Sequence, residues 1–594
     1  MEELPTPESR NEQFLAAVAG EPGELPSPAS RKELYLAAAA GMDGITVPTP
    51  ESREELYLDA IAEGGGGGGG GGGVKPLDPE KVYKETRPSD WLTMPSTIDN
   101  NEIYFLLHMP EDIGGTVSLS LNVTRKTNNQ TPTTIEFGTA PNGVFTPDPA
   151  LTITTTASTP SISVPASAYG NTTSAGEKQL IMKISNTGGI SAFGFPSSNA
   201  ATDLLRKQLV EAMVHLEEPN TSTINGLFGS QNQYNACLDL EYAYVEMPNF
   251  TDIKSLFLYC ESLVAVRKLD IKSVANLTST FAYCDSLIAI PKFDMKNATI
   301  ANGMFTNCRE LEAVPDLDFS SVTSAANLFQ SSGLKKVPSI DTKNVTNFSY
   351  MFSACVKLEE IPVLDTSSGT NFSYMFSGCS MLKTIPLLNT TSGTNFSYMF
   401  SGCTSLHSVP LLDTSNATSF KNIFYGCSTL KTAPEFNTSK VTDFGGAFYN
   451  CYSLNLAPKW DTNKGADFSN MFYNCFSLMY ADLSDYDFSS ATNMSYMFYG
   501  AESLYVIFDG KFPASGIPGS SSTYIVQARD NYVFVRTKIT KTDGVLTLPS
   551  NASTCFSGSN HYVYVPDDLL TAYQADSKWS TLSTRLKPIS EWMA

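Results

Sequence analysis

The sequence predicts a multidomain chain with short helical N-terminal repeats, an all-β sandwich-like domain, and an α/β solenoid with parallel strands that ends in a β/α cap. Two observations predict the solenoid. A unit of about two dozen residues recurs between Phe257 and Phe498, and nine of the eleven cysteines occupy one position in it. A fixed period of this length is typical of solenoids, in which each repeat buries its apolar face against its neighbours.

A repeating phenylalanine marks each copy, and positions in the repeat are counted from it. It lies at Phe257, Phe281, Phe305, Phe329, Phe352, Phe376, Phe400, Phe424, Phe448, Phe472 and Phe498. Apolar residues recur at positions −4, −1, 0 and +3. In the copy centred on Phe376 they are Phe372, Met375, Phe376 and Cys379. Because this spacing is typical of one helix face, we predict a short helix in every repeat.

A short strand is predicted after this helix. In the same copy Leu382 and Ile385 are three residues apart, and Pro386 follows them. We expect roughly three or four residues here to pair in parallel with the equivalent strand of the next copy. The proline is compatible with this strand because it stands where ladder pairing stops.

The cysteines support a stack of coils. Position +3 holds Cys260, Cys284, Cys308, Cys355, Cys379, Cys403, Cys427, Cys451 and Cys475. Equivalent residues of neighbouring coils lie about 4.8 Å apart with parallel Cβ vectors, whereas a disulfide needs converging Cβ atoms at about 3.8 Å. We therefore predict reduced thiols that fill the core. A metal site is a poorer interpretation, because the chain has no Cys-x-x-Cys and only four histidines.

The pattern Cys-x-x-Leu-x-x-Ile-Pro-x-Leu, read from Cys379 to Leu388, resembles the leucine-rich repeat of BspA-like bacterial surface proteins. The last copy, which leads to Phe498, is similar to the related repeat of mycoplasma-type surface lipoproteins and has Asp482 in place of the proline. This resemblance covers residues 257–504. It implies a leucine-rich-repeat solenoid, and solenoids bind ligands with the extended face that their strands line.

The regions on either side of the solenoid are expected to close its ends, since an open end would expose apolar core. Residues 201–256 are predicted to form an N-terminal cap and a degenerate repeat, with Ile224, Leu227 and Phe228 at −4, −1 and 0. Within this region, the periodicity of residues 204–216 fits a helix or a strand. Residues 505–594 are predicted to form the C-terminal β/α cap.

Residues 77–200 are predicted to form the β-sandwich-like domain. Apolar and polar residues alternate in 116–124, and turn residues separate the strands. Trp91 stands before these strands and is predicted to be a packing anchor; a platform for a ligand is the alternative. Residues 64–76, which include ten consecutive glycines, are predicted to be a flexible linker.

Residues 1–63 contain a second, separate repeat with three copies. Each copy has a capping box, a serine followed three residues later by glutamate, and continues as a helix of about ten residues. Because such short helices are marginal alone, we predict that they dock on a partner; a fluctuating tail is the alternative. The predicted docking residues are Ser9, Arg10, Phe14, Ser30, Arg31, Tyr35, Ser52, Arg53 and Tyr57.

This tandem repeat, which reads Pro5-Thr-Pro-Glu-Ser-Arg10 in its first copy, resembles the N-terminal segments of fibre-like virion proteins from phages of gut Firmicutes. The resemblance implies that residues 1–63 contact other virion proteins. It leaves open whether the chain also forms a homo-oligomer, as many fibres do.

Charge narrows the class of partner. The chain has 60 acidic and 39 basic residues and a net charge of −21, which argues against nucleic acid and anionic membranes as partners. No secretory signal, lipobox or apolar run of membrane-spanning length is visible. We therefore expect no nucleic-acid binding, no membrane insertion and no ordinary export route.

No set of residues predicts catalysis, a cofactor or a metal. The four histidines, His108, His215, His407 and His561, are scattered. The chain contains no phosphate loop, zinc-protease motif or nucleophile elbow. A repeating acid, as at Asp365 and Asp413, invites the idea of a calcium ladder, but side chains that satisfy turn amides are the stronger interpretation.

A binding surface is the remaining prediction. The variable positions beside the recurring Leu and Ile of the predicted strands include Glu359, Lys383, His407 and Lys431. Tyr350, Tyr374 and Tyr398 are predicted to be exposed on a neighbouring row, where rigid rings give contact area at low entropic cost. The alternative is a solvated stripe propagated by repeat duplication.

The functional prediction is a non-enzymatic phage virion protein that binds a host-surface glycan or protein through its solenoid. Such a protein is assembled in the host cytoplasm and released by lysis, so it needs no export signal. The alternative is a BspA-like adhesin on a bacterial cell surface. A third reading, a carbohydrate-active enzyme with its site in residues 77–200, is the weakest because no carboxylate pair stands out there.

Overall fold

The computed structural model describes most of the chain from residue 75 onward. The described residues are 75–110, 116–125, 131–158, 160–195, 205–217, 227–230, 236–501, 504–508, 511–518, 524–528, 535–540, 544–550 and 552–592. The chain divides into two compact units: the first ends at residue 322 and includes 332–340, and the second comprises 323–331 and everything from 341. The predicted helical repeats of residues 1–63 and the ten-glycine stretch of the linker lie outside the described residues.

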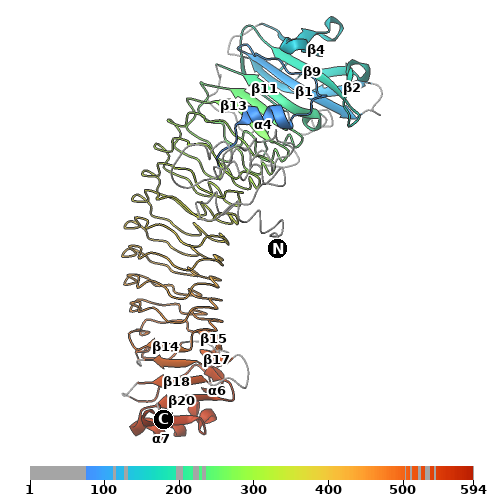
Figure 1. The fold of residues 1–594 in the computed structure, drawn as a ribbon. Helices are drawn as coiled ribbons and strands as arrows, with labels where there is room; N and C mark the ends of the chain where they lie inside the picture. Colours follow the sequence, from blue (N-terminus) through green and yellow to red (C-terminus); the bar gives the residue numbers. More distant parts are fainter. Residues whose placement is uncertain are drawn as a thin grey trace, which may run out of the picture. The chain divides into compact units, whose positions relative to one another are not determined.

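A nine-stranded sheet organises the first unit (Figure 1). Its main path is β13 (Ala265–Asp270), β12 (Tyr242–Glu246), β11 (Leu209–His215), β1 (Glu102–Pro110), β9 (Glu177–Ser185), β4 (Thr133–Thr139) and β5 (Thr146–Pro147), with β6 (Ile153–Thr155) on β4 and β8 (Asn171–Thr172) on β9. The strand β1 pairs antiparallel with β9 and β11, whereas β11, β12 and β13 pair in parallel. One sheet therefore runs from the predicted β-domain into the first coils.

Two small sheets complete the β-domain. They are β3 (Asn122–Arg125) with β10 (Ile190–Gly194), and β2 (Thr116–Ser120) with β7 (Ser161–Pro165). The ring of Phe193 on β10 packs against Phe105 on β1 at 5.4 Å, so apolar side chains fill the space between layers. Short 3-10 turns lie at Pro141–Gly143, Pro149–Leu151 and Ala166–Ala168. The β character predicted for residues 77–200 is confirmed.

The helix α4 (Pro79–Thr86) precedes the sheet. It begins where the Asp78 carboxylate accepts a hydrogen bond from the N–H of Glu80, with proline at the first helical position. Trp91 follows it, is 9% exposed, and packs edge-on against His108 at 4.5 Å. Trp91 is thus the packing anchor that its position predicts. The segment 204–216, which fitted helix or strand, contains β11.

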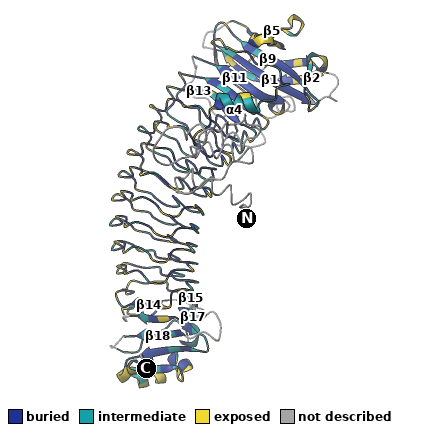
Figure 2. Cartoon of the chain, in the orientation of Figure 1, coloured by how far each residue is buried: buried dark blue, intermediate teal, exposed yellow. Residues whose placement is uncertain are grey.

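Stacked phenylalanines and thiols fill the coils of the second unit. The rings of Phe352, Phe376 and Phe400 are fully buried and lie parallel at 5.7 and 5.8 Å. All eleven cysteines are free and buried, which confirms the prediction made for the nine at position +3. The thiol of Cys403 also donates a hydrogen bond to the carbonyl of Phe376 in the preceding coil (3.0 Å). In Figure 2 the coil traces alternate between buried and exposed residues.

The degenerate repeat begins in the first unit as the sequence predicts. Leu227 and Phe228 are buried, and the Phe228 ring stacks on Phe257 at 5.5 Å. Its third predicted residue, Ile224, lies outside the described residues.

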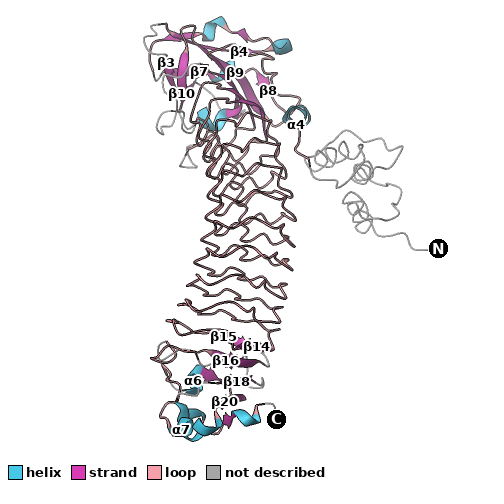
Figure 3. Cartoon of the chain, turned by 90° about the vertical axis from the view of Figure 1, so that its left-hand side faces the viewer, coloured by secondary structure: helices cyan, strands magenta, loops and turns pink. Residues whose placement is uncertain are grey.

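The prediction of a helix in every repeat is wrong: the described coils have consecutive tight turns there (Figure 3). The N–H of Tyr350 donates to the carbonyl of Ser373 in the next coil, while the N–H of Ser353 donates back to Tyr350, each at 3.0 Å. Alternate N–H groups thus join the next coil or close a turn. Turns that advance by three residues share the apolar spacing of a helix face, which explains the wrong prediction.

Left-handed backbone makes these turns. Every copy has two residues with φ between 51° and 77°, one at −2 and one at +2. Position −2 holds Ser255, Ser279, Gly303, Asn327, Tyr350, Tyr374, Tyr398, Asn422, Gly446, Asn470 and Tyr496, and position +2 holds Tyr259, Tyr283, Asn307, Ser331, Ala354, Gly378, Gly402, Gly426, Asn450, Asn474 and Gly500. Glycine and asparagine recur there because they tolerate this conformation best.

The predicted strand is present only in copies that lack the proline. β13 includes Arg267 at position +10, and β14 (Tyr480–Leu483) includes Asp482 there. Parallel bridges join position −5 of successive coils both in copies with proline at +10, such as those of Asn371 and Asn395, and in copies without it, such as those of Asp252 and Asp467. Because proline cannot donate to a ladder, the described copies with proline keep these bridges but form no strand after the turns.

Parallel strands also form the C-terminal part of the second unit (Figure 1). One sheet has the order β14, β16 (Tyr505–Phe508), β18 (Val535–Ile539), β20 (His561–Val565), β21 (Leu586–Pro588), and another has β15 (Phe498–Ala501), β17 (Val526–Ala528), β19 (Phe556–Ser557). Helices α6 (Ala552–Cys555) and α7 (Leu570–Ala575) and 3-10 turns Asp567–Leu569, Trp579–Leu582 and Ile589–Glu591 accompany them. Buried Trp579 and Trp592 pack in this region.

Candidate binding surface of the solenoid

The tyrosine row consists of Tyr350, Tyr374 and Tyr398, one from each of three successive coils. Their ring centroids are 4.4 and 4.3 Å apart, and neighbouring planes differ by 7°. All three are half-buried, so the prediction that they are exposed is wrong. Burial, followed by the neighbouring phenols, raises the pKa of Tyr374 well above its ordinary value.

This stacking changes what the tyrosine row offers to a ligand. Because each ring faces the next, the faces inside the row are covered, and ring edges and hydroxyls remain. Sugar rings and other flat groups pack on aromatic faces. The row is therefore a poor platform for them, and its stacking supports the left-handed backbone of its members.

A second tyrosine row, which the sequence analysis did not identify, occupies position +1 of later coils. It consists of Tyr425, Tyr449, Tyr473 and Tyr499, with centroids 4.8, 4.3 and 4.6 Å apart. Burial raises the pKa of Tyr473 to about 12. The signal of this row in the sequence was a tyrosine directly after the repeating phenylalanine in four successive copies.

The strand row is formed by Glu359, Lys383, His407 and Lys431, all at position +7 and all exposed. The N–H of His407 donates to the carbonyl of Lys383 in the preceding coil at 3.0 Å, so the backbone holds these two members of the row in register. The structure thus brings these four predicted residues together on successive coils. The tyrosine row, at position −2, is nine residues before the strand row in each copy. Its ring contacts link tyrosines of successive coils to one another.

An aliphatic row lies four residues further along the same segments. It consists of Val363, Leu387 and Leu411, which are 76%, 63% and 63% exposed. The next residue in each segment is a buried leucine, so the exposed side chains are not part of the core. The sequence analysis missed this row, although an apolar residue between proline and the core leucine was its signal.

The repeating acids satisfy turn amides, as predicted. The carboxylates of Asp365 and Asp413 each accept a hydrogen bond from the N–H two residues later, at 3.0 Å. Hydrogen bonds from Ser367 lower the pKa of Asp365. Among the described residues, no group of three or more His, Cys, Asp or Glu side chains is placed to hold a metal ion.

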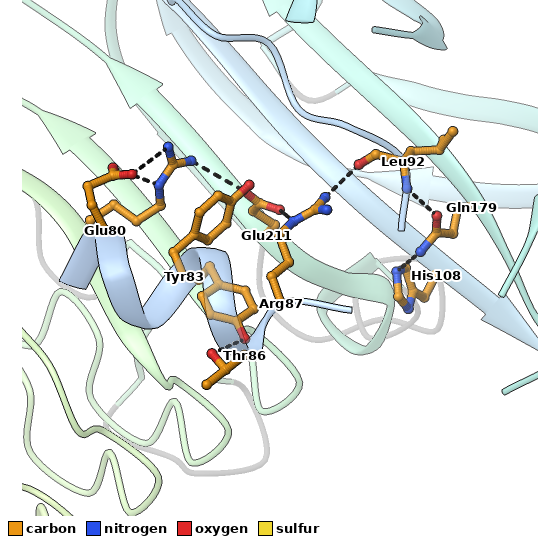
Figure 4. Close-up of polar contacts among 10 residues, drawn as sticks. Glu80, Tyr83, Thr86, Arg87, Leu92, His108, Gln179 and Glu211 are labelled. Carbon is orange, nitrogen blue, oxygen red and sulfur yellow. Dashed lines mark hydrogen bonds and ion pairs between the residues drawn. The ribbon is translucent and has the colours of Figure 1, made fainter. Parts of the chain in front are cut away.

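A deeply buried charged cluster belongs to the first unit (Figure 4). The Glu211 side chain is 1% exposed and pairs with Arg87 at 2.8 Å and Arg267 at 3.6 Å, and it accepts a hydrogen bond from the Tyr83 hydroxyl at 2.8 Å. Burial, followed by the Glu211 charge, raises the pKa of Tyr83. Arg267 also pairs with Glu80 at 3.0 Å. Every partner is internal, so this cluster fastens α4 to β11 and β13.

The docking residues from Ser9 to Tyr57 lie outside the described residues. In the part of the chain that is described, no helix is both long enough and apolar enough to span a membrane.

Comparison with known families gives one match. The family described as "Mycoplasma protein of unknown function, DUF285" matches residues 222–336, 331–434 and 408–508. These overlapping matches cover the predicted repeats, so the similarity to mycoplasma-type repeats is supported. A search of curated proteins finds no match.

Several solved structures of leucine-rich repeat proteins also match. They include a leucine-rich cell surface protein from Faecalibacterium prausnitzii (18% identity, TM-score 0.28, covering 44% of this chain and 83% of that one). Two leucine-rich repeat proteins follow, from Bacteroides ovatus (18%, 0.26, 50% and 89%) and Eubacterium ventriosum (16%, 0.33, 51% and 87%). The comparisons do not support the predicted phage resemblance.

Proposed function

We propose that this chain is a non-enzymatic binding protein that displays the strand row and the aliphatic row together as its binding face. Both rows lie on the short segments between Glu359 and Lys431 in the second unit. The observation that carries the proposal is the exposure of Val363, Leu387 and Leu411 beside exposed charged residues. Contiguous exposed apolar patches with a polar rim mark interaction sites.

A protein is favoured over a glycan as the ligand of this face. The exposed apolar groups are aliphatic, and the neighbouring tyrosines cover one another's ring faces. Lys383, His407 and Lys431 follow one another in the row, so two lysines and an imidazole line the side facing the partner. The complementary partner is a protein surface with apolar groups and carboxylates.

The ligand class is tested on an array of immobilised proteins and glycans probed with the full-length chain. We expect binding to proteins, and at least about a tenfold loss of affinity when Lys383, His407 and Lys431 are all replaced by alanine. Lys464→Ala is the matched control, because Lys464 is an exposed lysine at a different position of the coil. Binding to glycans alone, or equal losses in both variants, contradicts the proposal.

We propose that this protein is located on a bacterial cell surface and not in the virion predicted from residues 1–63. A surface location accords with the binding face, and the comparisons lend the virion role no support. One experiment distinguishes the two locations. Protease shaving of intact cells should release repeat peptides, whereas enrichment of those peptides in purified phage particles would favour the virion.

A further inference from the structure

A pocket of about 290 Å³ lies in the first unit, whereas the residues of the proposed binding face belong to the second unit. Its floor is formed by Tyr104 of β1, Lys183 of β9 and Glu136 of β4. These residues are direct partners across three adjacent strands, so their side chains share one face of the sheet. Its walls come from residues 95–99 and 143–147.

One carboxylate in this pocket is held by the protein itself. The Glu102 carboxylate pairs with the Lys183 ammonium at 2.6 Å and accepts hydrogen bonds from the Tyr104 hydroxyl at 2.9 Å and the Asp99 N–H at 3.3 Å. Burial, followed by the Glu102 charge, raises the pKa of Tyr104. Glu102 therefore fixes Lys183 and Tyr104 in place.

A second carboxylate is open to a ligand. Glu136 lines the pocket and is half-buried, and its side chain makes no hydrogen bond or ion pair with another described residue. Lys183 lies opposite it in register and has three ammonium donors, of which Glu102 occupies one. The pocket thus places the Glu136 carboxylate, as an acceptor, beside the Lys183 ammonium, a donor that Glu102 holds in place.

The walls are built before any ligand arrives. The N–H of Ser96 donates to the carbonyl of Gly143 at 3.0 Å, which joins the two wall segments. Gly143 has φ +74°, and a Cβ there would come within 3.1 Å of the Ser96 side chain. Phe145 packs edge-on against Tyr104 at 5.5 Å, and Val144 is exposed at the rim. A preformed pocket loses little entropy on binding.

The chemistry of the lining selects the ligand. Asp99, Glu102 and Glu136 outnumber Lys183, so negative charge disfavours anions. A cationic amine only donates hydrogen bonds and would meet the Lys183 ammonium, whereas a hydroxyl both donates to Glu136 and accepts from Lys183. Phe145 and Val144 offer apolar contact to a C–H face. The volume is near the lower limit of small-molecule sites, about 300 Å³.

We infer that this pocket binds a neutral saccharide unit, with neighbouring hydroxyls on Glu136 and Lys183 and its C–H face toward Phe145. This site is independent of the proposed protein-binding face. The inference concerns binding and not hydrolysis, because Glu102 is already engaged by three groups of the protein.

The test measures binding of the full-length protein to arrayed neutral, acidic and amino saccharides, followed by calorimetry on each hit. We expect neutral saccharides to bind, and Glu136→Gln and Phe145→Ala each to weaken affinity by about tenfold or more. The side chain of Glu136 is half-buried, so the glutamine variant should keep its unfolding temperature. The triple alanine variant of Lys383, His407 and Lys431 should bind saccharide normally.

Three results would overturn the inference: no saccharide binding at millimolar concentration, binding that survives both pocket substitutions, or preferential binding of diamines. Turnover of a bound saccharide would also overturn it, since it would make the pocket an active site. Loss of saccharide binding in the solenoid variant instead would show that the site lies on the coils. None of these outcomes decides whether the strand row and the aliphatic row bind a protein.

Discussion

Tyr374 and Tyr398 lie ring on ring, with centroids 4.3 Å apart, although both have left-handed backbone at φ 57° and 59°. A bulky residue in this conformation is unusual and costs free energy. In five other copies the same position is glycine or asparagine, which tolerate it best. Stacking between successive coils therefore offsets local strain in this part of the solenoid.

Substitutions of Tyr374 separate the contribution of ring stacking from the cost of the left-handed backbone. Tyr374→Gly loses the stacking but relieves the backbone, whereas Tyr374→Ala loses the stacking and keeps the strain. We expect the alanine variant to be less stable than the glycine variant by about 1 kcal/mol. Chemical denaturation followed by near-ultraviolet circular dichroism measures the difference.

Thr384 is the matched control because it is exposed and is not among the residues with positive φ. There the order should reverse, with glycine less stable than alanine by about 0.5–1 kcal/mol. The same order at both positions would refute the left-handed assignment of position −2.

Glu211→Gln tests the buried cluster that fastens α4. The substitution leaves Arg87 and Arg267 without their shared carboxylate in a buried site. We expect the free energy of unfolding of the first unit to fall by about 3 kcal/mol. Glu80→Gln, at a side chain that is 40% exposed, should cost less than about 1 kcal/mol. If thermal denaturation shows equal losses of stability for Glu211→Gln and Glu80→Gln, burial of the carboxylate does not determine its contribution.

The cysteines make stability depend on alkaline pH. Burial raises the pKa of Cys403 from 9.0 to about 12. Between these values the unfolded chain has lost the thiol proton and the folded chain has kept it, so stability falls as pH rises. Each such thiol contributes up to about 1.4 kcal/mol per pH unit.

Urea denaturation at pH 8, 9 and 10 measures this slope. Cys403→Ala removes one thiol and should make the decline shallower than in the native chain. A thiol reagent added at neutral pH should label no cysteine of the folded chain and all eleven after unfolding. Ready labelling of the native protein would contradict buried, protonated thiols.

The periodic features of the fold could be predicted from the sequence, because each repeat buries the same few positions. The stacked Phe376 and Cys379 and the turn role of Asp365 follow directly from their spacing. The helix was wrong because a three-residue turn and a helix share a spacing. Recurrent glycine or asparagine at −2 and +2 was the signal that distinguishes them.

Two features of the candidate sites could not be read from spacing alone. The covered faces of Tyr350 and Tyr374 depend on how rings meet between coils, which a one-dimensional pattern does not contain. The pocket at Glu136 and Lys183 joins strands 47 residues apart in sequence through sheet register. Strand alternation predicts which residues share a face, but not which strands become neighbours.

The central claim is that the strand row and the aliphatic row form a protein-binding face. The most direct measurement is selection of a displayed random-peptide library on the native chain, with counts compared on the Lys383, His407 and Lys431 triple alanine variant. We predict enrichment of peptides that combine acidic and apolar residues, and loss of these peptides on the variant but not on Lys464→Ala. Enriched peptides that bind all three proteins equally would contradict the claim.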